Sequence, residues 1–261
     1  MVSGTLPRRA TATAAPFQRT TFEMSRAAEY FTVRELQTLT GQQQHRFVSV
    51  ILKELLDNAI DAGETAGVAP VLHVGWVTDP DADQAQLTLT DNGPGIPRDT
   101  VRRILNFSTR TSDKAVYRSP TRGAQGNALK TVLGIPWALE VRAPLVIEAR
   151  GWRHVITVSV DPAGNVDVRD DETPMAKQPG TRISLTVPLQ DQDCDPTTWG
   201  RAFAVFNPHL SVKICQDDHG YAYRPMTGAA IFTNRRWTFL MRGTNMCPAT
   251  PPRRGGIAST I

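Results

Sequence analysis

The sequence has few cysteines and no long apolar run. Its three cysteines, Cys194, Cys215 and Cys247, lie far apart in a chain of 261 residues. That spacing argues against a disulfide framework and against a zinc site. No apolar stretch approaches the roughly 20 residues that cross a bilayer, and the N-terminus lacks the basic-then-apolar pattern of a signal peptide. We therefore expect a cytoplasmic protein without a membrane partner.

Positive charges outnumber negative charges only slightly. The formal net charge is +4, and 40% of the residues are hydrophobic, which is adequate for a sizeable core. Two groups of arginines stand out, one within residues 98–122 and one within residues 235–254. They are compatible with a nucleic-acid partner and equally with a solvated basic surface.

Composition divides the chain into three parts. Residues 1–20 are rich in Thr, Ala, Pro and Arg without an apolar period, which predicts a flexible N-terminal arm. Residues 21–215 carry helix and strand patterns and predict one folded domain. Residues 216–261 lose this periodicity and end in a stretch rich in Pro, Arg and Gly, so we expect a C-terminal extension whose order the pattern does not decide.

Apolar periodicity within the domain predicts helices at the front and mostly strands behind. Helical spacing covers residues 24–38 in short stretches, 42–62 as a long helix ending at Gly63, 98–107, 123–134 and 199–206. Strand patterns cover residues 71–77, 86–90, 145–150, 152–160, 166–169, 182–187 and 210–214, the first two as a hairpin. Residues 108–122 predict a long, lid-like connection. The order predicts an α/β fold, a two-layer sandwich with a mixed, largely antiparallel sheet.

The long helix places polar side chains on one face of an otherwise apolar element. Glu54, Asn58 and Asp61 follow an i, i+4, i+7 spacing and therefore share that face. A carboxylate and a carboxamide one turn apart on a packed helix are a candidate base and a candidate metal ligand.

A turn-rich segment follows the second predicted strand. Asp91 ends the strand, and Gly93, Gly95 and Ile96 follow it. The Asp91 carboxylate is able to accept a hydrogen bond from an exocyclic amine such as that of adenine, and the glycines let a flat ring approach the main chain. These residues are candidate nucleotide contacts, although a plain type I or II turn explains the same pattern.

Two further segments are weak signals when taken alone. A glycine-rich helix start offers backbone N–H groups and a positive helix end to an anion, and its lysine adds charge for a phosphate. Its candidate residues are Gly123, Gln125, Gly126, Asn127 and Lys130. The P-loop string GxxxxGK[ST] is absent, and close packing also explains these glycines. Thr181 opens a later strand, where a β-branched residue is expected anyway.

In this order and spacing the four segments resemble the GHKL ATPase superfamily, whose Bergerat nucleotide-binding fold occurs in gyrase-type and type IIB topoisomerases, MutL, Hsp90 and histidine kinases. The resemblance covers about residues 25–188. Residues 25–31 and the stretch Phe206-Asn207-Pro208-His209 are most similar to the ATPase domain in the B-type subunits of topoisomerase VI. The glycine loop, which contains Asn127-Ala128-Leu129, is instead closer to MutL.

The resemblance implies a role for each candidate residue. It implies that Glu54 is the general base that activates water and that Asn58 is the ligand of a Mg2+ ion. It further implies that Asp91 reads adenine, with Gly95 beside the ring and Thr181 supporting Asp91 through water. The residues that it places in the lid around the triphosphate are Gly123, Gln125, Gly126, Asn127 and Lys130.

We therefore expect an ATP-binding, Mg2+-dependent ATPase that forms a homodimer on nucleotide binding and acts on DNA with a separate cleavage or effector subunit. Glu54 counts against the histidine-kinase branch. No tyrosine-bearing cleavage domain is evident, so we do not expect this chain alone to cut DNA. The residues after the last motif are too few for a full transducer domain with its phosphate-contacting lysine, which predicts slow hydrolysis. A MutL-like ATPase, a MORC-like or Hsp90-like ATPase, and a nucleotide-responsive binding module remain alternatives.

Overall fold

The structure is a computed structural model, and it describes residues 30–107, 128–161, 166–189, 194–217, 219–223 and 237–238. Its helices are α1 (Val33–Thr40), the short 3-10 helix η2 (Gln44–Arg46), α2 (Phe47–Thr65), α3 (Arg98–Ile104), α4 (Ala128–Ala138) and α5 (Pro196–Phe206). Its strands are β1 (Val71–Asp79), β2 (Gln84–Thr90), β3 (Leu145–Ala149), β4 (Trp152–Val160), β5 (Val166–Pro174), β6 (Thr181–Pro188), β7 (Ser211–Gln216), β8 (His219–Tyr223) and β9 (Trp237–Thr238).

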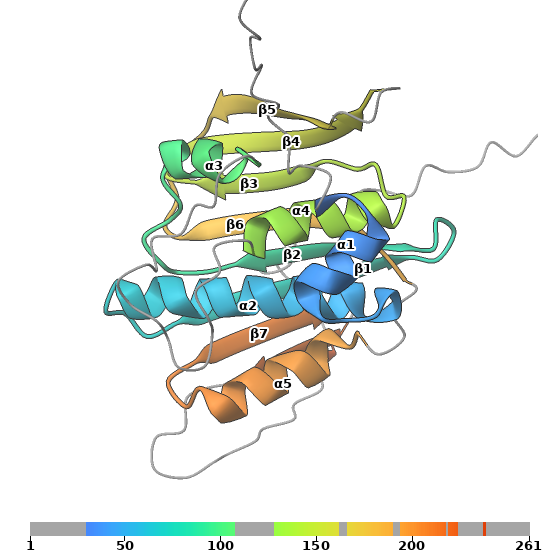
Figure 1. Cartoon of the computed structure of the whole chain (residues 1–261). Helices are drawn as coiled ribbons and strands as arrows, with labels where there is room; N and C mark the ends of the chain where they lie inside the picture. Colours follow the sequence, from blue (N-terminus) through green and yellow to red (C-terminus); the bar gives the residue numbers. More distant parts are fainter. Residues whose placement is uncertain are drawn as a thin grey trace, which may run out of the picture.

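All of these strands join one sheet in the order β5-β4-β3-β6-β2-β1-β7-β8-β9. Neighbouring strands pair antiparallel except β1 and β7, which run parallel. The helices lie over one face of the sheet, and the long α2 runs lengthwise along the strands near β1 and β7 (Figure 1). The predicted two-layer α/β sandwich with a mixed, largely antiparallel sheet is therefore confirmed.

The core lies between α2 and the central strands. Leu52, Leu55, Leu56 and Ile60 of α2 are at most 1% exposed, because a helix that covers a sheet buries a broad apolar stripe. The helix packs against β1, β2 and β6 beneath it and against α4 beside it. Within the described part of the chain, no helix has both the length and the apolar character that crossing a membrane requires.

The long helix begins and ends later than its pattern suggested. Residues 44–46 form a 3-10 turn, and α2 then runs from Phe47 to Thr65 instead of ending at Gly63. Gly63 is buried inside the helix, and a Cβ atom there would lie 3.1 Å from Cγ of Pro70. The prediction that Gly63 ends the helix was wrong, because this glycine serves the close approach of the chain that returns toward β1.

Other boundaries differ for equally local reasons. The helix predicted over residues 98–107 ends at Ile104, and β5 continues to Pro174 where only residues 166–169 were expected. The last helix starts three residues early, since the Asp195 side chain accepts hydrogen bonds from the amides of Thr197 and Thr198 as its N-cap. The sheet also continues past residue 215 into β8 and β9. The predicted N-terminal arm and most of the predicted lid and glycine loop lie outside the described residues.

The pairing register of β2 and β6 determines which loops lie side by side. Residues Gln84–Thr90 of β2 pair with β6 so that Thr90 lies opposite Arg182. The first residue after β2, Asp91, therefore lies beside Thr181, the first residue of β6. The end of one strand and the start of another, 90 residues apart in the sequence, form one edge of the candidate site.

Candidate functional site

One side of the site is the polar face of α2. Glu54 and Asn58 are partly exposed, whereas Asp57 and Asp61 are buried. The ammonium group of Lys53 lies 2.8 Å from Asp57 Oδ2 and 3.5 Å from Glu54 Oε1. Burial lowers the pKa of Lys53, but these two carboxylates outweigh burial and raise the pKa above its ordinary value. The exposed part of the face therefore offers one carboxylate and one carboxamide to solvent, with a cation beside the carboxylate.

The other side is the buried carboxylate of Asp91, which is 8% exposed. Its Oδ1 accepts hydrogen bonds from the amides of Gly93, at 2.8 Å, and Thr181, at 3.1 Å. Burial raises the pKa of Asp91, and the hydrogen bonds from Gly93 and Thr181 partly oppose that shift. A buried carboxylate with two amide donors on one oxygen keeps acceptor capacity on its other oxygen.

Two glycines make this arrangement sterically feasible. A Cβ atom at Gly180 would lie 1.8 Å from the main-chain oxygen of Asp91, and one at Gly95 would lie 2.8 Å from the oxygen of Gly180. Both glycines also have positive φ angles, +76° at Gly180 and +75° at Gly95. Only glycine combines this conformation with such a close approach at little cost. The two glycines therefore allow the loop after Asp91 and the start of β6 to pack directly against each other.

The loop after Asp91 is attached to α2. A Cβ atom at Gly93 would lie 3.0 Å from Cβ of Ala62, so this glycine packs against the last turns of the helix. The Asn92 side chain accepts a hydrogen bond from the amide of Val71 and donates one to the carbonyl of Ala69. These contacts bring the predicted adenine-reading loop and the predicted catalytic helix into one site.

Sequence reasoning missed a residue that holds the middle of this loop. Arg150, in the turn between β3 and β4, donates from Nε to the carbonyl of Pro94 at 2.9 Å, and its Cγ is the side-chain atom nearest to a Cβ built at Gly95. No local pattern marks Arg150, because its partner lies 56 residues earlier in the chain. Ile96, another predicted contact, is partly buried and packs against the core.

The glycine-rich segment is described only from its helix onward. Gly123, Gln125, Gly126 and Asn127 lie outside the described residues. Lys130 is 1% exposed, and its ammonium group donates to the carbonyl of Asn106 at 2.8 Å. The rings of Tyr30 and Phe107 lie 5.7 and 5.5 Å from that ammonium group. In this structure the Lys130 charge faces protein groups, and its contact with a phosphate stays a prediction.

Comparison with protein families places this site in a known context. The family model described as histidine kinase-, DNA gyrase B- and HSP90-like ATPase matches residues 43–191, more than half of the chain. The chain belongs to this family. The GHKL resemblance and its Bergerat fold are thereby confirmed. Domains of this GHKL family bind ATP, typically with Mg2+, and generally hydrolyse it.

The similar curated proteins include the B-type subunits of type 2 DNA topoisomerase 6 from several archaea. The protein of Pyrococcus furiosus is 24% identical over 76% of this chain and 36% of its own length. The protein of Archaeoglobus fulgidus is 26% identical over 66% of this chain and 29% of its own. The protein of Natronomonas pharaonis is 26% identical over 74% of this chain and 25% of its own length. The chain thus spans about a third of the length of these relatives or less.

Among solved structures, the ATPase region of Saccharomyces cerevisiae topoisomerase II matches with a TM-score of 0.41 and 15% identity. That match covers 64% of this chain and 47% of the other.

The contact at Gly180 leads to a first prediction. We expect Gly180→Ala to lower the free energy of unfolding by at least about 2 kcal/mol, because the new methyl group overlaps the Asp91 carbonyl. Gly41→Ala is the matched control, since Gly41 has a φ of +67° but no atom within 4 Å of its Cβ position. Urea unfolding of both variants measures the difference, and equal costs would show that the close approach carries no energy.

Proposed function

We propose that this chain is an ATP-binding and Mg2+-dependent ATP-hydrolysing module. The observation that carries the proposal is the buried Asp91 carboxylate, attached through its own loop to the helix that presents Glu54 and Asn58. One element offers a carboxylate for an amino group, and the other offers a base and a metal ligand. These are the two ends that hydrolysis of ATP requires.

Adenine fits the Asp91 end by hydrogen-bonding chemistry. Because Oδ1 already accepts two amide hydrogens, we expect Oδ2 to accept the exocyclic amino group of adenine. The Thr181 hydroxyl is a further donor toward Asp91. Guanine carries a carbonyl oxygen where adenine carries the amine, so this end favours ATP over GTP.

The distance along α2 from the adenine loop to Glu54 supports binding of the phosphates near Glu54. Ala62 touches the adenine loop at Gly93, and Glu54 lies eight residues earlier, which is about 12 Å along a helix. This span is comparable with the reach from an adenine ring to the terminal phosphate of ATP. Asn58, one turn nearer to the loop, would hold Mg2+ through its carboxamide oxygen.

In the proposed hydrolysis, Glu54 removes a proton from water. Its carboxylate accepts a proton from the attacking water while the water oxygen forms a bond to the γ-phosphorus and the bond to the β-γ bridging oxygen breaks. The ammonium group of Lys53 lies 3.5 Å from Oε1 of this carboxylate. Bound Mg2+ supplies charge neutralisation for the phosphates. Lid residues 123–127 and Lys130 are the proposed donors around the triphosphate.

We further propose a role like that of the B-type subunits of topoisomerase VI, in which nucleotide binding drives homodimer formation and the dimer acts on DNA with a cleavage or effector subunit. The names of the curated relatives support this assignment over a MutL-like, MORC-like or Hsp90-like role. The arginines within residues 103–122 and 235–254 are candidate contacts for DNA phosphates.

ATP specificity and its pH dependence test the Asp91 assignment. We expect ATP with Mg2+ at 100 times its Kd to stabilise the fold by about 2.7 kcal/mol and GTP to do far less. Since adenine binds the ionised carboxylate and burial raises the pKa of Asp91 above 3.8, ATP affinity falls as the pH drops through that raised pKa.

Asp91→Asn is the matched control for this titration. Its amide nitrogen faces the adenine amine as a second donor, so we expect weaker ATP binding without the Asp91 pH term. Calorimetric titration of both proteins at a series of decreasing pH values measures the Asp91 contribution, because the difference between them removes the titration of ATP itself. No stabilisation by either nucleotide at millimolar concentration would refute the proposed function.

Replacing Glu54, the proposed base, distinguishes ATP binding from ATP hydrolysis. We expect Glu54→Gln to lower kcat about a hundredfold or more while ATP affinity changes only a few-fold, because the amide cannot accept the proton. Glu64→Gln, at the far end of the same helix, is the control and should keep normal turnover. Phosphate release by the Glu54 variant at the parental rate rules out this base.

DNA binding tests the finer assignment. We expect the logarithm of the DNA binding constant of the ATP-bound protein to fall linearly with the logarithm of the salt concentration, with a slope of about −0.9 for each phosphate contacted. Fluorescence anisotropy at several salt concentrations measures the slope, and light scattering with and without ATP measures dimer formation. Absence of DNA binding at physiological salt would favour the MORC-like or Hsp90-like alternative.

A further inference from the structure

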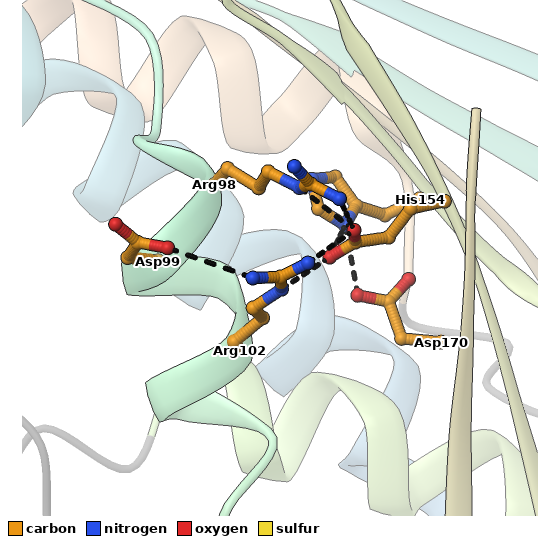
Figure 2. Close-up of polar contacts among 6 residues, drawn as sticks. Arg98, Asp99, Arg102, His154 and Asp170 are labelled. Atoms are coloured by element: carbon orange, nitrogen blue, oxygen red, sulfur yellow. Dashed lines mark hydrogen bonds and ion pairs between the residues drawn. The ribbon is translucent and has the colours of Figure 1, made fainter. Parts of the chain in front are cut away.

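A polar cluster outside the proposed nucleotide site connects α3 to the outer strands of the sheet. The cluster comprises Arg98 and Arg102 of α3, Trp152 and His154 of β4, and Asp170 and Glu172 of β5. Figure 2 shows the two arginines reaching from the helix toward His154 and Asp170 on the strands. Among the seven residues of α3 only Val101 is buried. Polar contacts therefore supply most of the attachment of this short helix.

Glu172 is the centre of the cluster. Its Oε2 accepts hydrogen bonds from Nε of Arg98 at 2.7 Å and from a terminal nitrogen of each arginine, and its Oε1 accepts one from Nε of Arg102 at 2.7 Å. The two guanidinium groups, that of Arg102 first, hold the pKa of Glu172 down at about 2. The carboxylate is thus ionised throughout the physiological range, and two-point contacts of this kind fix orientation as well as distance.

Residues of β4 and β5 lie next to the Glu172 carboxylate and to its partner Arg98. His154 lies opposite Glu172 in the β4–β5 register and is 1% exposed. Its Nδ1 lies 2.8 Å from Asp170 Oδ2 and 3.7 Å from Glu172 Oε1. On the other side, the guanidinium group of Arg98 stacks 3.7 Å above the centre of the Trp152 ring.

His154, Asp170 and Glu172 are also close enough together to hold a metal ion. Charge argues against that use. Both arginines pair with Glu172, so a divalent cation would enter a site that already contains two guanidinium groups. The cluster is better suited to holding α3 than to binding a cation.

The position of α3 matters because the helix begins where the adenine loop ends. Arg98 is three residues beyond Gly95, at most about 10 Å of extended chain. The loop starts at Asp91, which is held by the amide of Thr181, and its middle is held by Arg150 at the Pro94 carbonyl. Glu172 holds its far end through Arg98.

We propose that Glu172 is a positioning residue for the nucleotide site, which acts by anchoring α3 to β5 and thereby fixes the exit of the adenine loop. This inference rests on the proposed ATP-binding function. Glu172 itself touches no part of the nucleotide. Its loss lets α3 and the C-terminal half of the loop shift, which weakens adenine binding in the ground state and in the transition state alike.

The test compares Glu172→Gln with Asp99→Asn. Both remove one negative charge near Arg102, but Asp99 is 88% exposed and lies 3.8 Å from that arginine. We expect Glu172→Gln to raise the Kd and KM for ATP about tenfold with kcat within about twofold of the parent, because uniform binding is lost. Asp99→Asn should leave all three constants unchanged. Arg102→Lys, which keeps the charge but loses the two-point contact, should raise KM less.

Each outcome decides the inference. Unchanged KM in both Glu172→Gln and Arg102→Lys overturns it, and so does a fall in kcat at constant KM. Stabilisation of the parent by Zn2+ that Glu172→Gln abolishes would show a metal site instead. A parent protein that binds no ATP refutes the proposed function, and this inference with it, whereas a parent that binds normally beside an unaffected Glu172 variant refutes the inference alone.

Discussion

The pairing of Asp91 with Thr181 is the contact on which the rest of the site depends. The amide of Asp91 donates to the carbonyl of Thr181, and the amide of Thr181 donates to the Asp91 side chain. This exchange continues the β2–β6 ladder by one step and turns a strand end into a buried acceptor. It is possible only because Gly180 has no side chain to strike the Asp91 carbonyl.

Burying a carboxylate is costly, and the fold offsets that cost locally. The amide donors from Gly93 and Thr181 stabilise the ionised form of Asp91 against the effect of burial on its pKa. The same loop then packs on Ala62 of α2. A buried acceptor and a long helix with a partly exposed candidate base are thus parts of one body, which preorganises both ends of the proposed ATP site.

Much of this arrangement could be predicted from local pattern. The spacing of Glu54 and Asn58 puts them on one helix face whatever the helix packs against, and Asp91 with its glycines follows a strand of clear alternation. The hairpin of β1 and β2 was predicted for the same reason. The ends of helices were harder to predict. Gly63 is of a residue type that often ends a helix, but here it allows the helix to pack closely against Pro70.

The resemblance of the motifs indicated the family. Spacing along single elements predicted the shared helix face and the candidate acceptor, because that spacing depends on backbone geometry alone. The groups that lie beside them became evident in the folded chain. The approach of Gly180 to Asp91, the hold of Arg150 on Pro94, the burial of Lys130 and the anchoring of α3 by Glu172 all join distant segments. Such contacts follow from strand register and from which polar groups find partners on burial, and no local period encodes either.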